Sequence, residues 1–260
     1  MTKRIPLSGQ QVGWSLAAAV LLFAAGLWLF TRLEPRPAAQ SKLPAEEFEQ
    51  RVRSYLLDNP EVVAEALQRL EERQRAAEAS ESKSVLAKRA EEVFRDPASP
   101  VGGNPQGDVT LVEFFDYNCS FCRQMAPHVT KAERDDPRLR IVYKDISILG
   151  PNSSFAAKAA LAAHRQGKYV AFHKALMEAK DSHNEASILE AAGRVGLDLE
   201  RLKRDISEPS IQDVLDRNLA LAQALRIDGT PAFVIGDQIA RGAVDLATMQ
   251  DMIRAAREKK

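Results

Sequence analysis

Cysteine and histidine are both scarce in this chain of 260 residues, which has two cysteines and four histidines. The cysteines, Cys119 and Cys122, are too close together to crosslink distant parts of the fold, so packing alone has to stabilise the core. A tetrahedral zinc site needs four ligands, and the histidines do not form a pair at the usual ligand spacing. We therefore expect no metal or other cofactor, and we expect His128 to be a solvated or core residue rather than a ligand.

An excess of charge of either sign is also missing. Lysine and arginine together number 36, and aspartate and glutamate together number 36. Proteins that bind nucleic acids usually present a basic surface to the phosphates. The balance of charge gives no support for nucleic acid as a partner, and none is expected.

The most informative stretch is Glu113 to Cys122, which contains both cysteines. Val109 to Phe115, which overlap its start, are β-branched, aromatic and apolar, and this predicts a buried strand. A helix is predicted to follow Cys119, whose sulfur would then lie beside unpaired backbone N–H groups and the positive end of the helix dipole. Such a position lowers a thiol pKa, so Cys119 is the candidate nucleophile and Cys122, one turn on, is the candidate resolving thiol.

Glu113 precedes Cys119 by six residues on a strand that is otherwise apolar. Burial there would raise its pKa and would let it exchange a proton with the thiol of Cys122. The alternative is an edge-strand glutamate that faces water. Lys144, on the predicted neighbouring strand, is a candidate partner for Glu113, although most strand lysines face solvent.

Two other uses of the cysteine pair remain open. An inert structural disulfide across so short a loop would constrain the unfolded chain little and would stabilise the fold weakly. Two adjacent thiolates are also soft ligands that suit Cu(I). Met125 is close to them, but no cluster of methionines or histidines accompanies the pair.

The segment Phe-Phe-Asp-Tyr-x-Cys-x-x-Cys at residues 114–122 resembles the active-site segment of the DsbA branch of the thioredoxin superfamily, a group of exported thiol–disulfide oxidoreductases. The resemblance runs from about Pro100 to the C-terminus and includes Gly103-Asn104-Pro105 and Gly229-Thr230-Pro231. It implies an α/β thioredoxin fold with an inserted helical domain. It also implies that the acid at position 113 is buried.

The resemblance implies a substrate-binding role for Thr230 and Pro231. From the sequence, Pro231 begins a strand and Thr230 is extended. The pair resembles the cis-proline loop of the family, which implies that the backbone of Thr230 pairs with an extended substrate strand beside Cys119.

Four further residues are candidate contacts around the sulfurs. Ser120 and Phe121 lie between the cysteines and set their redox poise, and Tyr117 and Asn118 are predicted contacts at the rim. Strongly oxidising DsbA enzymes carry a histidine where Phe121 stands. Because Phe121 offers no hydrogen bond or positive charge to a thiolate, we predict a disulfide less oxidising than the extreme of about −120 mV.

Val12 to Phe30 is an uncharged run of about nineteen residues. A helix of this length spans the ~30 Å hydrocarbon layer of a bilayer. The run is long for a cleaved signal peptide, so we predict a retained transmembrane anchor at residues 12–31 after a cytoplasmic tail at residues 1–11. A disulfide-cycling pair suits an oxidising compartment, so we expect the catalytic domain in the periplasm. The same location is expected if residues 12–31 are instead a cleaved signal.

A linker rich in proline and alanine is predicted at residues 32–44, and a helical arm at residues 45–96. The arm is interrupted at Asp58-Asn59-Pro60 and carries an apolar stripe between Phe48 and Leu70. Its segment at residues 56–63 resembles the N-terminal segment of ScsC-type proteins, copper-sensitivity suppressors of which some oligomerise through it. A solvated spacer and a homo-oligomerisation segment both remain open for this arm.

The catalytic domain is predicted at residues 97–260. A strand at residues 140–146, a helical insertion at about 151–227, a hairpin at residues 232–241 and a last helix capped by Asp245 follow the redox helix. We predict a thiol–disulfide oxidoreductase whose partners are cysteine-containing proteins and a membrane redox protein. Oxidase and isomerase or reductase activity both stay open, and a copper-binding or chaperone module is the alternative.

Overall fold

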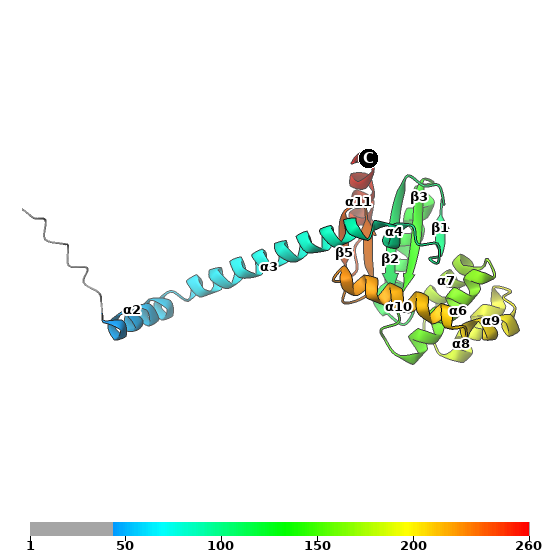
Figure 1. Ribbon diagram of the computed structural model, residues 1–260, viewed down its shortest axis with the longest axis horizontal. Helices are drawn as coiled ribbons and strands as arrows, with labels where there is room; N and C mark the ends of the chain where they lie inside the picture. The colour runs from blue at the N-terminus through cyan, green and yellow to red at the C-terminus, as the bar shows by residue number, and fades with distance from the viewer. Residues whose placement is uncertain (1–43, 260) are drawn as a thin grey trace, which may run out of the picture. The chain divides into compact units, whose positions relative to one another are not determined.

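The computed structural model describes residues 44–259, whose helices and strands Figure 1 shows. The chain divides after Leu67 into two compact units. The helices are α2 (Ala45–Asp58), α3 (Pro60–Lys88), α4 (Ala90–Phe94), α5 (Ser120–Asp135), α6 (Pro151–Arg165), α7 (Tyr169–Met177), α8 (Glu185–Arg194), α9 (Leu199–Ile206), α10 (Pro209–Ala224) and α11 (Leu246–Glu258). The strands are β1 (Val101–Gly103), β2 (Val109–Phe115), β3 (Leu139–Asp145), β4 (Ala232–Ile235) and β5 (Gln238–Arg241).

The strands form one mixed sheet in the order β1-β3-β2-β4-β5. β2 and β3 are parallel and are connected through α5, whereas the other neighbouring pairs are antiparallel. The β4–β5 hairpin turns at Gly236, whose φ of +60° lies in the left-handed region that glycine tolerates. The predicted α/β fold is confirmed, and β2 lies at the centre of the sheet.

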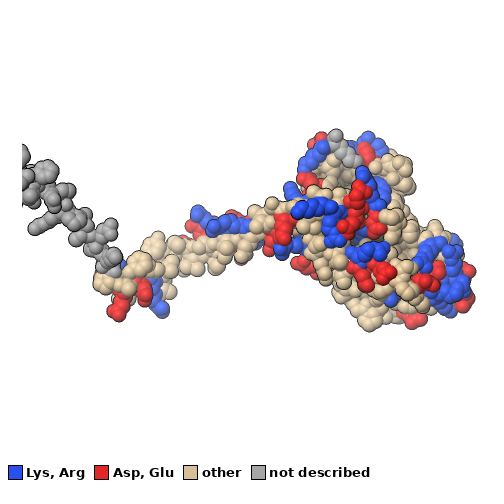
Figure 2. All heavy atoms as spheres, viewed as in Figure 1, with Lys and Arg blue, Asp and Glu red and all other residues tan. Residues whose placement is uncertain are grey.

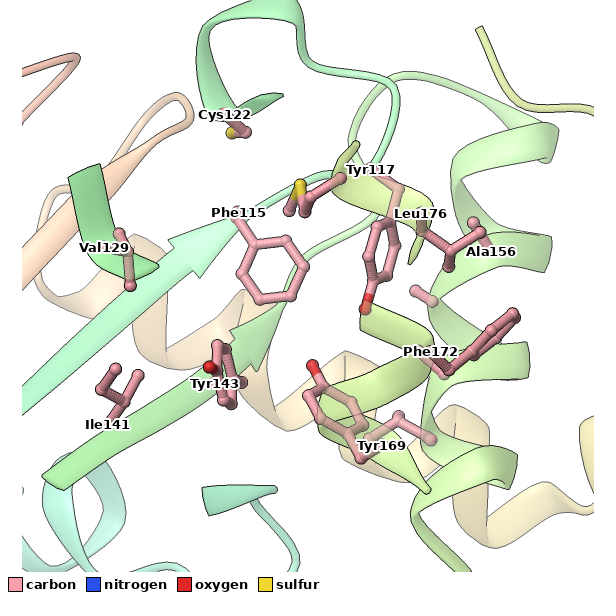
Figure 3. Packing of buried hydrophobic residues seen from close by; sticks show 14 of the residues in the cluster. Phe115, Tyr117, Cys122, Val129, Ile141, Tyr143, Ala156, Tyr169, Phe172 and Leu176 are labelled. Atoms are coloured by element: carbon pink, nitrogen blue, oxygen red, sulfur yellow. The ribbon is translucent and has the colours of Figure 1, made fainter. Parts of the chain in front are cut away.

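The two faces of the sheet carry different cores because successive side chains of a strand alternate between faces. Residues 111, 113 and 115 of β2 face α5, α7 and α11, together with residues 141 and 143 of β3. Residues 112 and 114 face the opposite way, toward α10, α4 and the end of α3. Figure 3 shows the first of these cores, in which Phe115 and Tyr143 lie beside Ile141 and Val129.

The helices from α6 to α9 pack tightly against each other. α6 begins with Pro151 at its first turn, where a missing N–H costs nothing, and its buried face consists largely of alanine. Small side chains let neighbouring helices approach closely, so five alanines of α6 are fully inaccessible to solvent: Ala156, Ala159, Ala160, Ala162 and Ala163.

The end of the predicted arm belongs to the core of the sheet domain. Leu86 of α3 and Val93 of α4 are buried in the same cluster as Val112 and Phe114 of β2. Ser82 is also buried, and its hydroxyl donates a hydrogen bond to the carbonyl of Leu225 at 3.3 Å. The prediction of an arm through residue 96 is therefore wrong from about Ser82 onward, because this part of the helix covers an otherwise exposed apolar face.

The unit that ends at Leu67 contains α2 and the first part of α3. α2 has no buried residue and ends at Asp58. Asn59 is the single residue between α2 and the start of α3 at Pro60. Large apolar side chains are exposed on this unit: Phe48, Val52, Tyr55, Leu57, Val63 and Leu67. The predicted apolar stripe is thus present and uncovered by the rest of its own unit.

No helix within residues 44–259 is both long and apolar enough to cross a bilayer. The anchor predicted at residues 12–31, the tail before it and the linker up to residue 43 lie outside the described residues. On the face of the domain shown in Figure 2, basic and acidic side chains are interspersed rather than gathered by sign.

Candidate active site

Cys119 occupies the N-cap position of α5, four residues after the end of β2 at Phe115. Its backbone is extended, with φ −75° and ψ 116°, and its N–H donates to the carbonyl of Asp116 at 3.0 Å. The thiol donates to the carbonyl oxygen of Thr230 at 3.3 Å, across 111 residues of sequence. The predicted strand-to-helix junction and the Thr230-Pro231 loop, whose peptide bond is cis, therefore meet at the sulfur.

Cys122 lies one turn further along α5 and is wholly buried, whereas Cys119 keeps 7% of its surface exposed. Both residues are free thiols. Burial raises the pKa of the Cys122 thiol, and the neighbouring Cys119 sulfur adds to the rise. One sulfur can thus be reached from outside, and the other can act only on its neighbour.

Glu113 lies in the middle of β2 and is 1% exposed, so the alternative of an edge glutamate in water is wrong. Its Oε1 atom is buried and has no hydrogen-bond partner in the part of the chain that the structure describes. Burial, and secondly the charge of Asp145, raise the pKa of Glu113 to about 8. Glu113, Tyr143 and His173 line a cavity of about 770 Å³ between α5 and α7, together with polar residues of both helices.

Lys144 does not pair with Glu113, contrary to the expectation from sequence. In the β2–β3 register Glu113 is opposite Tyr143 and Phe114 is opposite Lys144, so Lys144 points to the other face of the sheet. There it is 1% exposed, and its Nζ contacts Asp96 Oδ2 at 3.0 Å. Burial lowers the pKa of Lys144, and the Asp96 carboxylate opposes that shift.

Tyr117 belongs to the loop of residues 116–119 between β2 and α5, here called the redox loop, but its side chain is only 1% exposed and so does not lie at the rim. Its hydroxyl is 3.1 Å from His173 Nδ1, and the hydroxyl of Tyr169 donates to Asp145 Oδ2 at 2.8 Å. Figure 3 shows the hydroxyl groups of Tyr117 and Tyr169 pointing into the same buried region. A polar cluster of α7, β3 and the redox loop therefore underlies the cysteines, and it was not expected from the sequence.

The rim around Cys119 is apolar and involves a loop that was also not expected from the sequence. Phe121, Ile148 and Leu149 are exposed by 56%, 40% and 52%. The carboxylate of Asp116, itself buried, accepts the backbone N–H groups of Ile148 at 2.9 Å and Leu149 at 3.1 Å. An exposed Ile-Leu pair followed by glycine was the available sequence signal for a contact surface.

Asn118 is half-buried and connects the redox loop to the helices. Its Oδ1 accepts the backbone N–H of His183 at 2.7 Å, and its Nδ2 is 3.4 Å from the Ser153 hydroxyl. Ser120 is exposed at the first turn of α5. Within residues 44–259 no group of three or more histidine, cysteine, aspartate or glutamate side chains is arranged to hold a metal ion.

Comparisons with known proteins agree with this geometry. The family described as "DSBA-like thioredoxin domain" matches residues 110–254, and "Copper resistance protein ScsC N-terminal domain" matches residues 46–77. A thioredoxin-like oxidoreductase from Silicibacter pomeroyi is 48% identical, covers 65% of this chain and 97% of its own, and superposes with a TM-score of 0.63. Proteus mirabilis ScsC in a transitional conformation is 31% identical, with 83% and 99% covered and a TM-score of 0.64.

Curated relatives include much longer proteins. The Na(+)/H(+) antiporter NhaA 3 of Salinispora tropica is 27% identical over 158 residues, or 60% of this chain. The chain spans about a quarter of the length of such relatives (24% for this one). The match over residues 110–254, the sheet order and the cysteine pair at the start of α5 together show that the chain belongs to the DSBA-like thioredoxin domain family.

Proposed function

We propose that the protein is a periplasmic thiol–disulfide oxidoreductase that acts on cysteines of exported proteins. The chain has the DsbA-like thioredoxin fold, and the unequal burial of its two sulfurs carries the proposal. Cys119 lies at the N-terminus of α5 with some surface exposed, and Cys122 is enclosed one turn away. This asymmetry supports one attacking and one resolving sulfur.

In the reductive direction, the thiolate of Cys119 attacks one sulfur of a client disulfide, and the other client sulfur leaves as a thiolate that takes up a proton. Cys122 then loses its proton and attacks the Cys119 sulfur of the mixed disulfide, which releases the second client thiol. Glu113 accepts the proton of Cys122 in this proposal, because its side chain lies on the face of β2 that α5 covers and Cys122 is one of the buried residues of α5. Oxidation of a client dithiol is the reverse sequence.

The client segment is proposed to lie between the Thr230 loop and the apolar rim. The carbonyl of Thr230 already faces the Cys119 sulfur, so an extended segment that reaches this sulfur passes along the backbone of Thr230. Phe121, Ile148 and Leu149 then offer apolar surface to the client side chains. Such contacts are not specific for one sequence, which suits a catalyst with many clients.

Turnover needs a partner that restores the starting redox state, and we propose a membrane redox protein for this role. The predicted anchor at residues 12–31 would hold the domain in the periplasm beside such a partner. Two features favour an isomerase or reductase over an oxidase. Phe121 supplies no stabilising charge to the Cys119 thiolate, and the exposed stripe of the α2 unit supports association of several copies through it.

Refolding of a scrambled-disulfide protein tests the direction and the role of the arm together. The deletion has to stop at residue 67, because Ser82 and Leu86 are part of the domain core. We expect the truncated protein to lose oligomers and isomerase activity while it still reduces insulin. Val52→Glu should reproduce the loss of oligomers, and Gln50→Glu, an exposed change of similar size on the same helix, should not. Unchanged isomerase activity after truncation would exclude the oligomeric isomerase.

The thiol chemistry itself is tested by single-sulfur variants. Cys119→Ser should abolish insulin reduction. Cys122→Ser should accumulate mixed disulfides between Cys119 and client proteins, and these should persist until dithiothreitol reduces them. Full activity of Cys119→Ser would refute the proposed function.

A copper-binding role is the second candidate, favoured by the match of residues 46–77 to the N-terminal domain described for a copper resistance protein. The two thiols suit Cu(I), but within residues 44–259 no third histidine, cysteine or carboxylate joins them. Titration of the reduced protein with Cu(I), beside the insulin assay, separates the two functions. Tight binding without turnover would favour the metal module.

A further inference from the structure

Asp145 is a second buried carboxyl on the same side of the sheet as Glu113. Tyr143 is opposite Glu113 in the parallel register, and Asp145 follows two residues later on β3, so both acids point toward α5 and α7. Each is 1% exposed. The two carboxyls therefore share one low-dielectric region beneath the cysteines.

Within residues 44–259 no lysine or arginine forms an ion pair with either carboxyl, and Glu113 Oε1 and Asp145 Oδ1 have no hydrogen-bond partner there. Lys144, between Tyr143 and Asp145 in sequence, is on the opposite face with Asp96. Two ionised carboxylates on the same buried side of the sheet would thus lack an ion-pair partner among the described residues, and each would oppose the ionisation of the other.

The side chains that act on the proton affinity of Asp145 are neutral or acidic: Tyr169, Tyr117 and Asp116. Burial, and secondly the charge of Lys174, lower the pKa of His173 on α7 to about 3, so this histidine stays neutral. Lys174 itself pairs with Glu133 at 3.2 Å. Burial raises the pKa values of the nearby tyrosines. Asn218 of α10 donates only to the backbone carbonyl of Asp145, at 3.1 Å. The titratable neighbours are Glu113 on β2, Tyr143 on β3, Asp116 and Tyr117 on the redox loop, and Tyr169 and His173 on α7.

We propose that Asp145 is a positioning residue of the redox site, whose ionisation sets the proton affinity of Glu113, so that the two carboxyls take up and release protons as a coupled pair. The inference rests on the proposed role of Glu113 as the acceptor of the Cys122 proton. With Asp145 ionised, a Glu113 carboxylate binds the proton of Cys122 more tightly when the Cys122 sulfur bonds to Cys119. With Asp145 neutral, Glu113 ionises more easily but is a weaker base.

The two acids titrate in the range where such coupling affects catalysis. Burial raises the pKa of Asp145 to about 7, while the Tyr169 hydroxyl lowers it, and the Asp145 charge contributes to the rise of the Glu113 pKa to about 8. A general base works best when its pKa lies near the operating pH. Asp145 is therefore placed to adjust the proton affinity of Glu113 around neutral pH, and it acts on the cysteines only through Glu113.

Carboxyl carbon NMR of the reduced full chain, titrated from pH 4 to 10, tests this coupling directly. In Asp145→Asn we expect the midpoint of Glu113 to fall by about one pH unit. In Glu113→Gln the midpoint of Asp145 should fall by a similar amount, since linkage makes the coupling reciprocal. Asp216→Asn, the same change at an exposed site on α10, should leave Glu113 unmoved.

A titration midpoint of Glu113 that stays within about 0.2 units of the parent in folded Asp145→Asn would overturn the proposal, because coupled groups must shift each other. If this variant does not fold, Tyr169→Phe keeps the carboxyl and removes one hydrogen-bond donor to it. It should raise the Asp145 midpoint and lower that of Glu113, and an unmoved Glu113 would refute the proposal equally.

The pH profile of insulin reduction separates this role from a structural one. We expect Asp145→Asn to shift the profile to lower pH with a similar plateau, whereas loss of structure would lower the plateau without shifting the midpoint. A parent protein without exchange activity at any pH would refute the proposed function and leave the NMR coupling intact. An active parent whose Glu113 titration ignores Asp145 would refute only the coupling.

Discussion

Replacement of Glu113 by glutamine is expected to stabilise the protein by an amount that grows with pH. Burial raises the pKa of Glu113 to about 8, against 4.5 for an ordinary glutamate. Between these two values the folded protein holds a proton that the unfolded chain has released, so the parent loses stability as pH rises through this window. Glutamine has a similar shape and cannot ionise, so the variant avoids this loss.

The magnitude follows from the two pKa values. Each unit corresponds to about 1.4 kcal/mol, so the difference between the Glu113→Gln variant and the parent should grow by about 3 kcal/mol from pH 4.5 to pH 7 and level off above pH 8. The parent profile alone is not diagnostic, because His173, with its pKa lowered to about 3, makes the folded state less stable as pH falls below about 6.5. The difference between variant and parent removes this contribution.

Urea unfolding of the reduced proteins at four values between pH 4.5 and pH 8 measures the effect. Near-ultraviolet circular dichroism reports on three buried tyrosines of the same region, Tyr117, Tyr143 and Tyr169. The transition that it detects is therefore the unfolding of the domain that contains the sheet. A difference in unfolding free energy that is constant across pH would refute the reasoning. The same variant should resolve mixed disulfides at least about tenfold more slowly near pH 7, since the proton acceptor is gone.

Three further changes test other parts of the structure. Lys144→Met should lower the unfolding free energy by about 2–4 kcal/mol because Asp96 loses its ion-pair partner. In a double-mutant cycle measured by urea unfolding, Asp96→Asn in the same chain should restore part of this loss. Additive effects of the two substitutions would contradict the ion pair. Asp116→Asn should release the loop at residues 148–149, which limited proteolysis detects as faster cleavage there than in the parent. Phe121→His should make the disulfide more oxidising by about 30 mV or more in glutathione equilibrium, and an unchanged potential would show that this position does not set the poise.

Local pattern was sufficient to predict most elements around the cysteines. The apolar run of β2 and the hairpin of β4 and β5 follow from side-chain alternation and turn residues, and the structure confirms them. Asp245 caps α11 as predicted, since its side chain accepts the N–H of Thr248 at 2.7 Å. These features depend on neighbours in sequence, so no knowledge of the rest of the fold was needed.

The errors concern contacts between distant segments. Pairing of Lys144 with Glu113 depended on the β2–β3 register, which puts the two side chains on opposite faces. Tyr117 was expected at the rim because loop residues usually contact solvent, yet α7 covers it with His173. The last part of the arm is core because an apolar sheet face needed a helix to cover it.

The amino-acid sequence by itself determined the two sulfurs, their spacing and their position where a strand runs into a helix, because these depend on residues that are adjacent in the chain. Only the tertiary structure decided that the carbonyl of Thr230 faces Cys119, and that Glu113 and Asp145 are both buried on the same side of the sheet. Desolvation and charge repulsion act through space, so the proton affinities at this site depend on which distant segments exclude water from it.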